Sequence, residues 1–202
     1  SFPFTGSLTP LVFVAWIPLF LVQQNISDKR YRSGKVFIHA YLTFFIYNIG
    51  TTWWVWNASG GGAAMAILLN SLFMALTFQL FHFSKRKLNL KFAIYTLPFF
   101  WVTFEYLHLR WEMSWPWLMF GNVFSITPSW VQWYSITGAL GGTLWVLYVN
   151  ILLFEMLRSW KNSNRLKLRK YTLMAGALLF VPLACSLIQY ASFTDQGRKI
   201  EV

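Results

Sequence analysis

Residues 63–87 read AAMAILLNSLFMALTFQLFHFSKRK, a long uncharged apolar run that ends on Ser84 and three basic residues. A helix needs about 20 apolar residues to cross roughly 30 Å of hydrocarbon. This run is long enough to cross. Because positive loops stay on the cytoplasmic side during membrane insertion, the basic end also gives the helix a direction. The stretch predicts a membrane-spanning helix whose C-terminal end faces the cytoplasm.

The same pattern recurs along the chain. Apolar spans cover residues 8–24, 36–56, 63–83, 92–109, 131–157 and 171–192. Most of the 17 Lys and Arg residues fall in three clusters between spans: Lys29, Arg30, Arg32 and Lys35; Lys85, Arg86, Lys87 and Lys91; and Arg158, Lys161, Arg165, Lys167, Arg169 and Lys170. We therefore predict an all-α fold, a polytopic bundle of six transmembrane helices over residues 1–192. Its basic loops are cytoplasmic, and both ends of the chain are periplasmic.

Composition agrees with a membrane protein. The mean hydropathy is +0.47, 56% of residues are hydrophobic and 11% are charged. The net charge of +11 lies in clusters next to the spans, where topology and anionic lipid headgroups explain it, so we expect no nucleic-acid partner. The single cysteine excludes an internal disulfide. No histidine pair has metal-ligand spacing, and we expect neither a metal nor a cofactor.

Glu105 is the most unusual residue by position, because it lies inside a predicted span. A carboxylate at membrane depth is costly unless it has a partner or lies near water. His108 follows three residues later on the same helical face, and Arg110 lies at the rim. Two interpretations remain open: a polar group facing a lipid or substrate cavity, or a structural carboxylate that hydrogen-bonds a neighbouring helix or the following loop.

One stretch resembles the Glu…(Phe)-Pro-Trp…Gly segment of apolipoprotein N-acyltransferases. It reads Glu105-Tyr-Leu-His108-Leu-Arg-Trp-Glu-Met-Ser-Trp115-Pro116-Trp117-Leu-Met-Phe-Gly121-Asn122. The opening Ser1-Phe2-Pro3, the Gly50-Thr-Thr-Trp53 sequence and residues 132–150 are similar to other parts of the same family. Two positions depart from its pattern. Trp115 stands where Phe is commoner, and His108 stands where Arg is expected, with Arg110 displaced by two residues.

The resemblance implies an enzyme, an acyltransferase of the bacterial inner membrane. Such enzymes transfer a fatty acyl chain from a phospholipid to the N-terminal diacylglyceryl-cysteine of a lipoprotein, through a thioester on a cysteine. The implied Glu–Lys–Cys triad belongs to a periplasmic nitrilase-like domain, and residues 193–202 resemble the linker and first strand leading into it. The resemblance thus places no catalytic residue in this chain, which should be inactive alone. Its implied partners are membrane phospholipid as acyl donor and diacylated apolipoprotein as acceptor, with the enzyme a monomer.

The candidate site residues are accordingly ones that face the substrate or lipid, or that brace the loop. They are Glu105, His108, Trp115, Pro116, Trp117, Gly121 and Trp53. We expect Trp115, Pro116 and Trp117 to form part of a lipid entry or a platform beneath the catalytic domain, with Glu105 bracing that loop. The alternative function is a six-helix substrate-binding subunit of a small-molecule membrane transporter. A structural or assembly subunit is a third interpretation.

Overall fold

The computed structural model describes residues 8–29, 31–88, 93–112 and 114–193, and over this part it is helical, with no β-strand. It contains six α-helices: α2 (Ile17–Asp28), α3 (Gly34–Thr52), α4 (Gly60–Leu88), α5 (Leu97–His108), α6 (Tyr134–Lys161) and α7 (Arg165–Ser192). The predicted all-α bundle is therefore confirmed. The expected strand near residue 199 and the Ser1–Pro3 segment lie outside the described residues.

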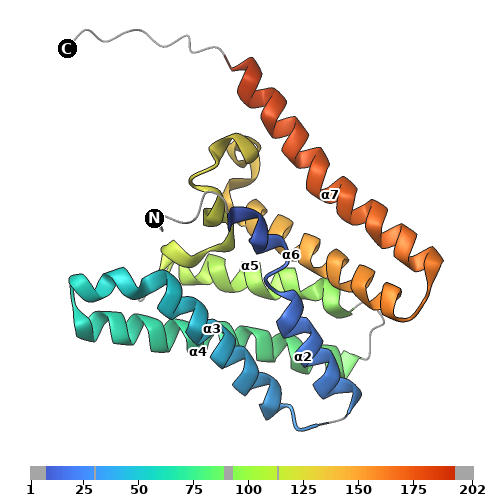
Figure 1. The fold of residues 1–202 in the computed structure, drawn as a ribbon. Coiled ribbons are helices and arrows are strands. Elements are labelled where there is room, and N and C mark those ends of the chain that lie inside the picture. Colours follow the sequence, from blue (N-terminus) through green and yellow to red (C-terminus); the bar gives the residue numbers. More distant parts are fainter. Residues whose placement is uncertain (1–7, 30, 89–92, 113, 194–202) are drawn as a thin grey trace, which may run out of the picture.

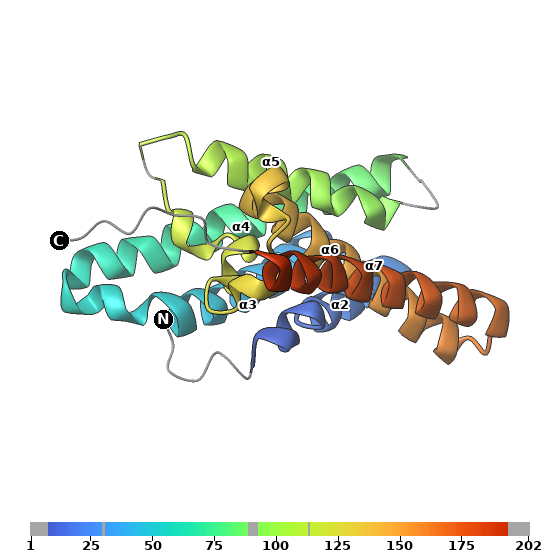
Figure 2. The same ribbon diagram turned by 90° about the horizontal axis from the view of Figure 1, so that it is seen from above.

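The helices form two antiparallel pairs joined by a central helix (Figure 1). One pair is α3 with α4, the other is α6 with α7, and α5 packs between α4 and α6. Helix α2 crosses against both α3 and α6, which ties the two pairs together. Helix α7 lies along α6 at the outer margin of the bundle in Figure 1, and in the view from above in Figure 2 it runs in front of the other helices. The loop between α5 and α6 sits at one end, beside the start of α6.

In the part of the chain that the structure describes, four stretches of helix are long and apolar enough to cross a membrane. They are Thr9–Asp28, Gly60–Lys87, Tyr134–Lys161 and Arg165–Ser192. Helix α3 has 19 residues and α5 has only 12, so at 1.5 Å per residue α5 is about 18 Å long. The protein is thus a membrane protein, and of the six α-helices among its described residues four lie in stretches that can span the bilayer by length and composition.

Prolines explain why two of the expected spans begin late. Pro98 stands at the start of α5, so the span expected over residues 92–109 becomes a 3-10 helix, η3 (Ala93–Thr96), followed by a short α-helix. The span expected over residues 8–24 likewise divides into η1 (Thr9–Phe13) and α2, with Pro18 in the first turn of α2. Proline lacks an N–H, which suits the first turn of a helix and breaks a longer one.

Asn150 hydrogen-bonds the backbone groups at the break between η1 and α2. Its side chain is fully buried in α6, where Oδ1 accepts from the Trp16 N–H at 3.0 Å and Nδ2 donates to the Val12 carbonyl at 2.8 Å. Away from water, unpaired backbone groups are costly, so a chain break at membrane depth needs such partners. One amide side chain therefore makes an interrupted first helix possible.

Trp16, held at this break, is the centre of the aromatic core. Its ring meets Trp101 edge-on at 4.6 Å between centroids and Phe120 at 5.3 Å. It also contacts Phe44 of α3 and Phe78 of α4. The indole thus joins four separate elements and positions the loop that carries Phe120 against the membrane helices.

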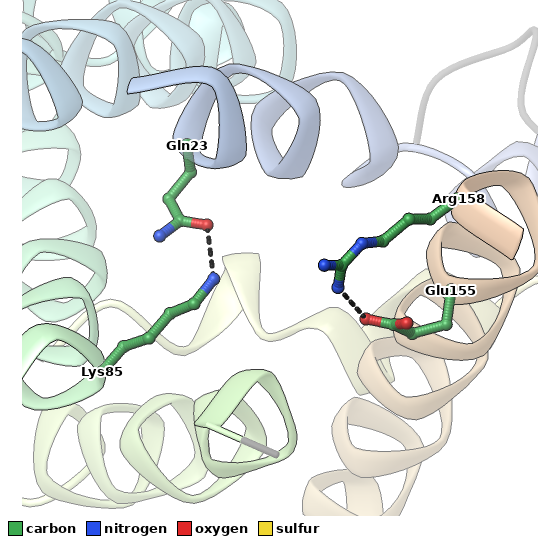
Figure 3. A network of polar contacts seen from close by, with 4 residues as sticks. All are labelled: Gln23, Lys85, Glu155 and Arg158. Atoms are coloured by element: carbon green, nitrogen blue, oxygen red, sulfur yellow. Dashed lines mark hydrogen bonds and ion pairs between the residues drawn. The ribbon is translucent and has the colours of Figure 1, made fainter. Parts of the chain in front are cut away.

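The basic clusters gather at the end of the bundle away from that loop. Arg86 donates to Ser33 Oγ at 2.7 Å, and Lys85 donates to Gln23 Oε1 at 3.0 Å. Figure 3 shows Lys85 with Gln23 and, across from them, the Glu155–Arg158 pair, whose charged atoms are 3.5 Å apart as expected for neighbours one helical turn apart. The described residues of the three clusters therefore lie at one end of the bundle, and the side of the membrane that this end faces stays a prediction.

Replacing Asn150 by Ala should lower the stability of the protein, because it leaves the Trp16 N–H and the Val12 carbonyl unpaired. At about 1–3 kcal/mol for each of these two buried groups, we expect a loss of roughly 2–6 kcal/mol. Thermal unfolding in detergent measures it. Asn57→Ala, at an exposed position, is the matched control. Equal melting temperatures for the two variants would contradict this role for Asn150.

Candidate functional site

The Glu105 carboxylate is buried and accepts three hydrogen bonds. Oε1 accepts from Trp101 Nε1 at 3.2 Å and from the backbone N–H of Phe120 at 3.1 Å. Oε2 accepts from Thr143 Oγ1 at 2.7 Å. Those donors come from α5, the α5–α6 loop and α6. Of the two interpretations left open by the sequence, the contacts match the structural one: Glu105 binds a neighbouring helix and the following loop.

Gly121 fits against α6 with no space for a side chain. Its N–H donates to Thr143 Oγ1 at 3.0 Å, and its carbonyl accepts from Tyr134 Oη at 2.9 Å. A Cβ on Gly121 would overlap the Ala139 backbone, and one on Gly142 would lie 2.9 Å from the Gly121 Cα. The loop and the helix therefore touch backbone to backbone, next to the Glu105 carboxylate.

Helix α6 bends where the loop meets it. Gly138 has a φ of +64°, which side chains disfavour, and it interrupts the helical backbone inside α6. The bend sets the first turn of α6, which carries Tyr134, apart from the straight part that carries Thr143. Both parts hydrogen-bond Gly121, so the loop is held from two sides.

Trp117 and Trp53 lie together at this end of the bundle. Trp117 is 63% exposed and meets Trp54 edge-on at 6.0 Å between centroids. Trp53 and Trp54 belong to η2 (Trp53–Asn57), at the end of α3. Asn122 Nδ2 donates to the Pro116 carbonyl at 2.8 Å, which closes the Pro-Trp turn. All of these side chains except that of Pro116 line a cavity of about 710 Å³ together with Tyr47, Thr51 and Met119.

His108 and Trp115 lie on the other side of the loop, toward α4. His108 is buried and stacks on Phe104 at 5.2 Å between centroids. With Trp115, Asn70 and Ser114 it lines a smaller cavity of about 210 Å³. No hydrogen bond joins His108 to Glu105 in the described structure, although the two share a helical face. The predicted residues therefore form two groups, with Glu105 and Gly121 between them.

Three residues that complete the site were missed by the sequence analysis. Trp101 precedes Glu105 by one helical turn, and that spacing was a usable signal. Thr143 lies 38 residues after Glu105, and nothing in its sequence context marks it. Phe120 contributes a backbone N–H, which every residue but proline carries. The arrangement fixes the α5–α6 loop against α5 and α6 and leaves aromatic side chains exposed beside it.

The sequence is similar to known proteins of one kind. Residues 1–152 match the family described as apolipoprotein N-acyltransferase N-terminal domain. An apolipoprotein N-acyltransferase of Chlorobaculum tepidum is 28% identical over 145 residues, 72% of this chain and 26% of that protein. The enzyme of the same name from Pasteurella multocida is 25% identical over 96% of this chain and 35% of its own length.

A third relative, from Geobacter metallireducens, carries the same name and is 27% identical over 79% of this chain and 31% of its own length. The chain thus spans roughly a quarter to a third of the curated relatives that it matches. No solved structure matches it. None of these three relatives is a transporter subunit. Since the family match covers most of its length, this chain belongs to the apolipoprotein N-acyltransferase family, to whose N-terminal domain it corresponds.

Proposed function

We propose that this chain is the membrane-embedded part of an enzyme that moves a fatty acyl chain from a phospholipid to the N-terminal diacylglyceryl-cysteine of lipoproteins. The observation that carries the proposal is the α5–α6 loop, which Glu105 holds at the Phe120 N–H and which carries the Pro-Trp turn beside a cavity rich in aromatic side chains, at the end of the bundle opposite the basic clusters. With those clusters on the cytoplasmic side, this end faces the periplasm.

The proposed reaction proceeds in two balanced steps on a cysteine outside this chain. The thiolate attacks an ester carbonyl of the phospholipid, a thioester forms, and the departing lysophospholipid alkoxide takes a proton. The α-amino group of the lipoprotein cysteine then attacks the thioester. An amide forms, the nitrogen loses a proton, and the thiolate is restored. Residues of this chain hold the lipids and supply none of the reacting atoms.

Binding the lipids should raise the rate of acyl transfer. Both substrates are anchored by acyl chains, and their ester and amine groups lie at headgroup depth. Fixing the chains against a rigid bundle lowers the entropy lost when those groups meet the thiolate. Indole favours the boundary between hydrocarbon and water. The exposed rings of Trp53 and Trp117 therefore suit the depth at which the ester and amine groups of the substrates would lie.

The complete protein should form an acyl-thioester from labelled phospholipid, whereas residues 1–202 alone should form none. The intermediate is measured as the label that stays with the protein on a gel and is released by hydroxylamine. Complete protein without phospholipid is the blank. Labelled thioester on Cys185, which is exposed on α7, would show that the chemistry has been assigned to the wrong part of the protein.

Glu105→Ala should destabilise the complete protein, because three donors lose their acceptor at once. At about 1–3 kcal/mol for each, the melting temperature should fall clearly. The melting temperature of the Glu105→Gln variant should fall less, because glutamine keeps an acceptor oxygen. Glu112→Ala, at an exposed site, should leave melting unchanged. If the Glu105→Ala and Glu112→Ala variants melt alike, the bracing role is refuted.

Trp117→Ala should leave stability within about 0.5 kcal/mol, because the side chain is largely exposed. It should slow acyl transfer to a diacylated peptide by up to about tenfold, the effect of one lost aromatic contact of roughly 1.4 kcal/mol. Trp160→Ala is the matched control, since Trp160 is 68% exposed at the basic end. Equal rates for both variants would exclude Trp117 from the substrate path.

A further inference from the structure

A groove runs between α4 and α5 on the outside of the bundle. It has a volume of about 810 Å³, and its wall is nearly all apolar. Side chains that shape it along its length are those of Phe73, Leu76, Leu80, Phe99, Thr103 and Leu107. The two helices are antiparallel, so Phe73 faces the C-terminal end of α5 and Phe81 meets Phe100 near its start. The groove therefore follows the direction of a lipid chain in the bilayer.

His108 lies in the wall at one end of this groove. Its side chain is only 7% exposed, and neither ring nitrogen has a hydrogen-bond partner in the described structure. A neutral imidazole carries one donor and one acceptor. Leaving both unpaired in a buried site is unfavourable, because each loses its hydrogen bonds to water and gains none in the protein. Such a ring is typical of a site that a polar ligand completes.

Arg110 lies at the same end, in the groove wall. Its guanidinium rests 4.3 Å above the Tyr106 ring, and it is exposed. Within the described residues no carboxylate pairs with it, although Glu112 follows two positions later. The guanidinium is planar and always charged, and it matches the geometry of a phosphate. An apolar channel therefore ends at an unpaired cation and an unpaired imidazole.

We propose that the groove binds a phospholipid. One acyl chain lies along α4 and α5, the phosphate contacts the Arg110 guanidinium, and His108 donates a hydrogen bond to a phosphate or ester oxygen. The charge of the phosphate complements Arg110, and the apolar wall matches the chain. That this lipid is the acyl donor rests on the function proposed above, but its binding does not.

Photolabelling tests the proposal. The complete protein is placed in phosphatidylethanolamine vesicles with a trace of phospholipid that carries a diazirine in one acyl chain. Labelled peptides are then mapped by mass spectrometry. Label should concentrate on α4 and α5 over residues 73–80 and 99–107. Diacylglycerol with the same diazirine chain is the matched probe, because it lacks the phosphate.

Two variants examine the polar end. Arg110→Gln should lower phospholipid labelling of the groove about fivefold, as expected for one basic residue near a lipid headgroup, and should leave diacylglycerol labelling unchanged. His108→Phe keeps the stacking on Phe104. It should lower phospholipid labelling without lowering the melting temperature, because it removes two unpaired polar atoms. A lower melting temperature with unchanged labelling would mean that His108 is only a packing residue.

Two further variants examine the apolar channel. Thr103→Trp should fill the groove and abolish its labelling by both probes. Ile46→Trp, on the exposed face of α3, is the control and should change neither. The proposal is overturned if α7 residues 173–188 are labelled as strongly as the groove, or if Arg110→Gln has no effect on phospholipid labelling.

Acyl transfer measured in parallel separates the two hypotheses. Normal transfer with no preferred labelling of the groove leaves the enzyme function standing and removes the lipid site. The opposite outcome is preferred labelling of the groove that Arg110→Gln lowers, together with wild-type protein that transfers no acyl chain. It would support the lipid site and contradict the proposed enzyme function.

Discussion

One buried carboxylate holds together the end of the molecule where we place its function. Glu105 collects donors from its own helix, from the α5–α6 loop and from α6, at a depth where water is scarce. Without these bonds the loop would be held to the bundle by its apolar contacts and by the hydrogen bonds of Gly121 with Thr143 and Tyr134. Burying a carboxyl group is unfavourable unless it is hydrogen-bonded, and the three donors satisfy it here. The bond to Phe120 lies three residues after Trp117, so it fixes the loop just beyond the Pro-Trp turn.

The two ends of the bundle are built differently. The basic end is joined by long flexible side chains such as Lys85 and Arg86, whose bonds are partly exposed. The opposite end is joined by backbone contacts, a bent helix and stacked rings. A rigid surface of this kind suits the docking of lipid chains, because little conformational freedom remains to be lost on binding. The difference matches an assignment of substrate handling to the aromatic end and of orientation in the membrane to the basic end.

Charge and hydropathy were enough to predict the helical bundle and the gathering of the described basic residues at one end. They also marked Glu105 as a carboxylate within the bundle, whereas Gly121 was named only through the family resemblance. They were not enough to place the helix boundaries around Pro18 and Pro98, because a buried partner such as Asn150 decides whether a break at membrane depth is tolerated. Thr143 could not be predicted from the sequence for a similar reason, because its role comes from a tertiary contact. His108 shares a face with Glu105, yet the rings of Phe104 and Phe73 turn it toward α4.

Helix α7 differs from its neighbours in how little of it is packed. Within its most apolar window 11% of residues are buried, against 50% for α6. Ser186 accepts from the Gln132 N–H, and the Leu178 carbonyl accepts from Trp145, so its polar contacts with the rest of the protein lie on one line. At 28 residues it is about 42 Å long, more than the hydrocarbon is thick. Because few contacts hold α7 to the other helices, its tilt can adjust to a thinner bilayer without disturbing the core of the bundle.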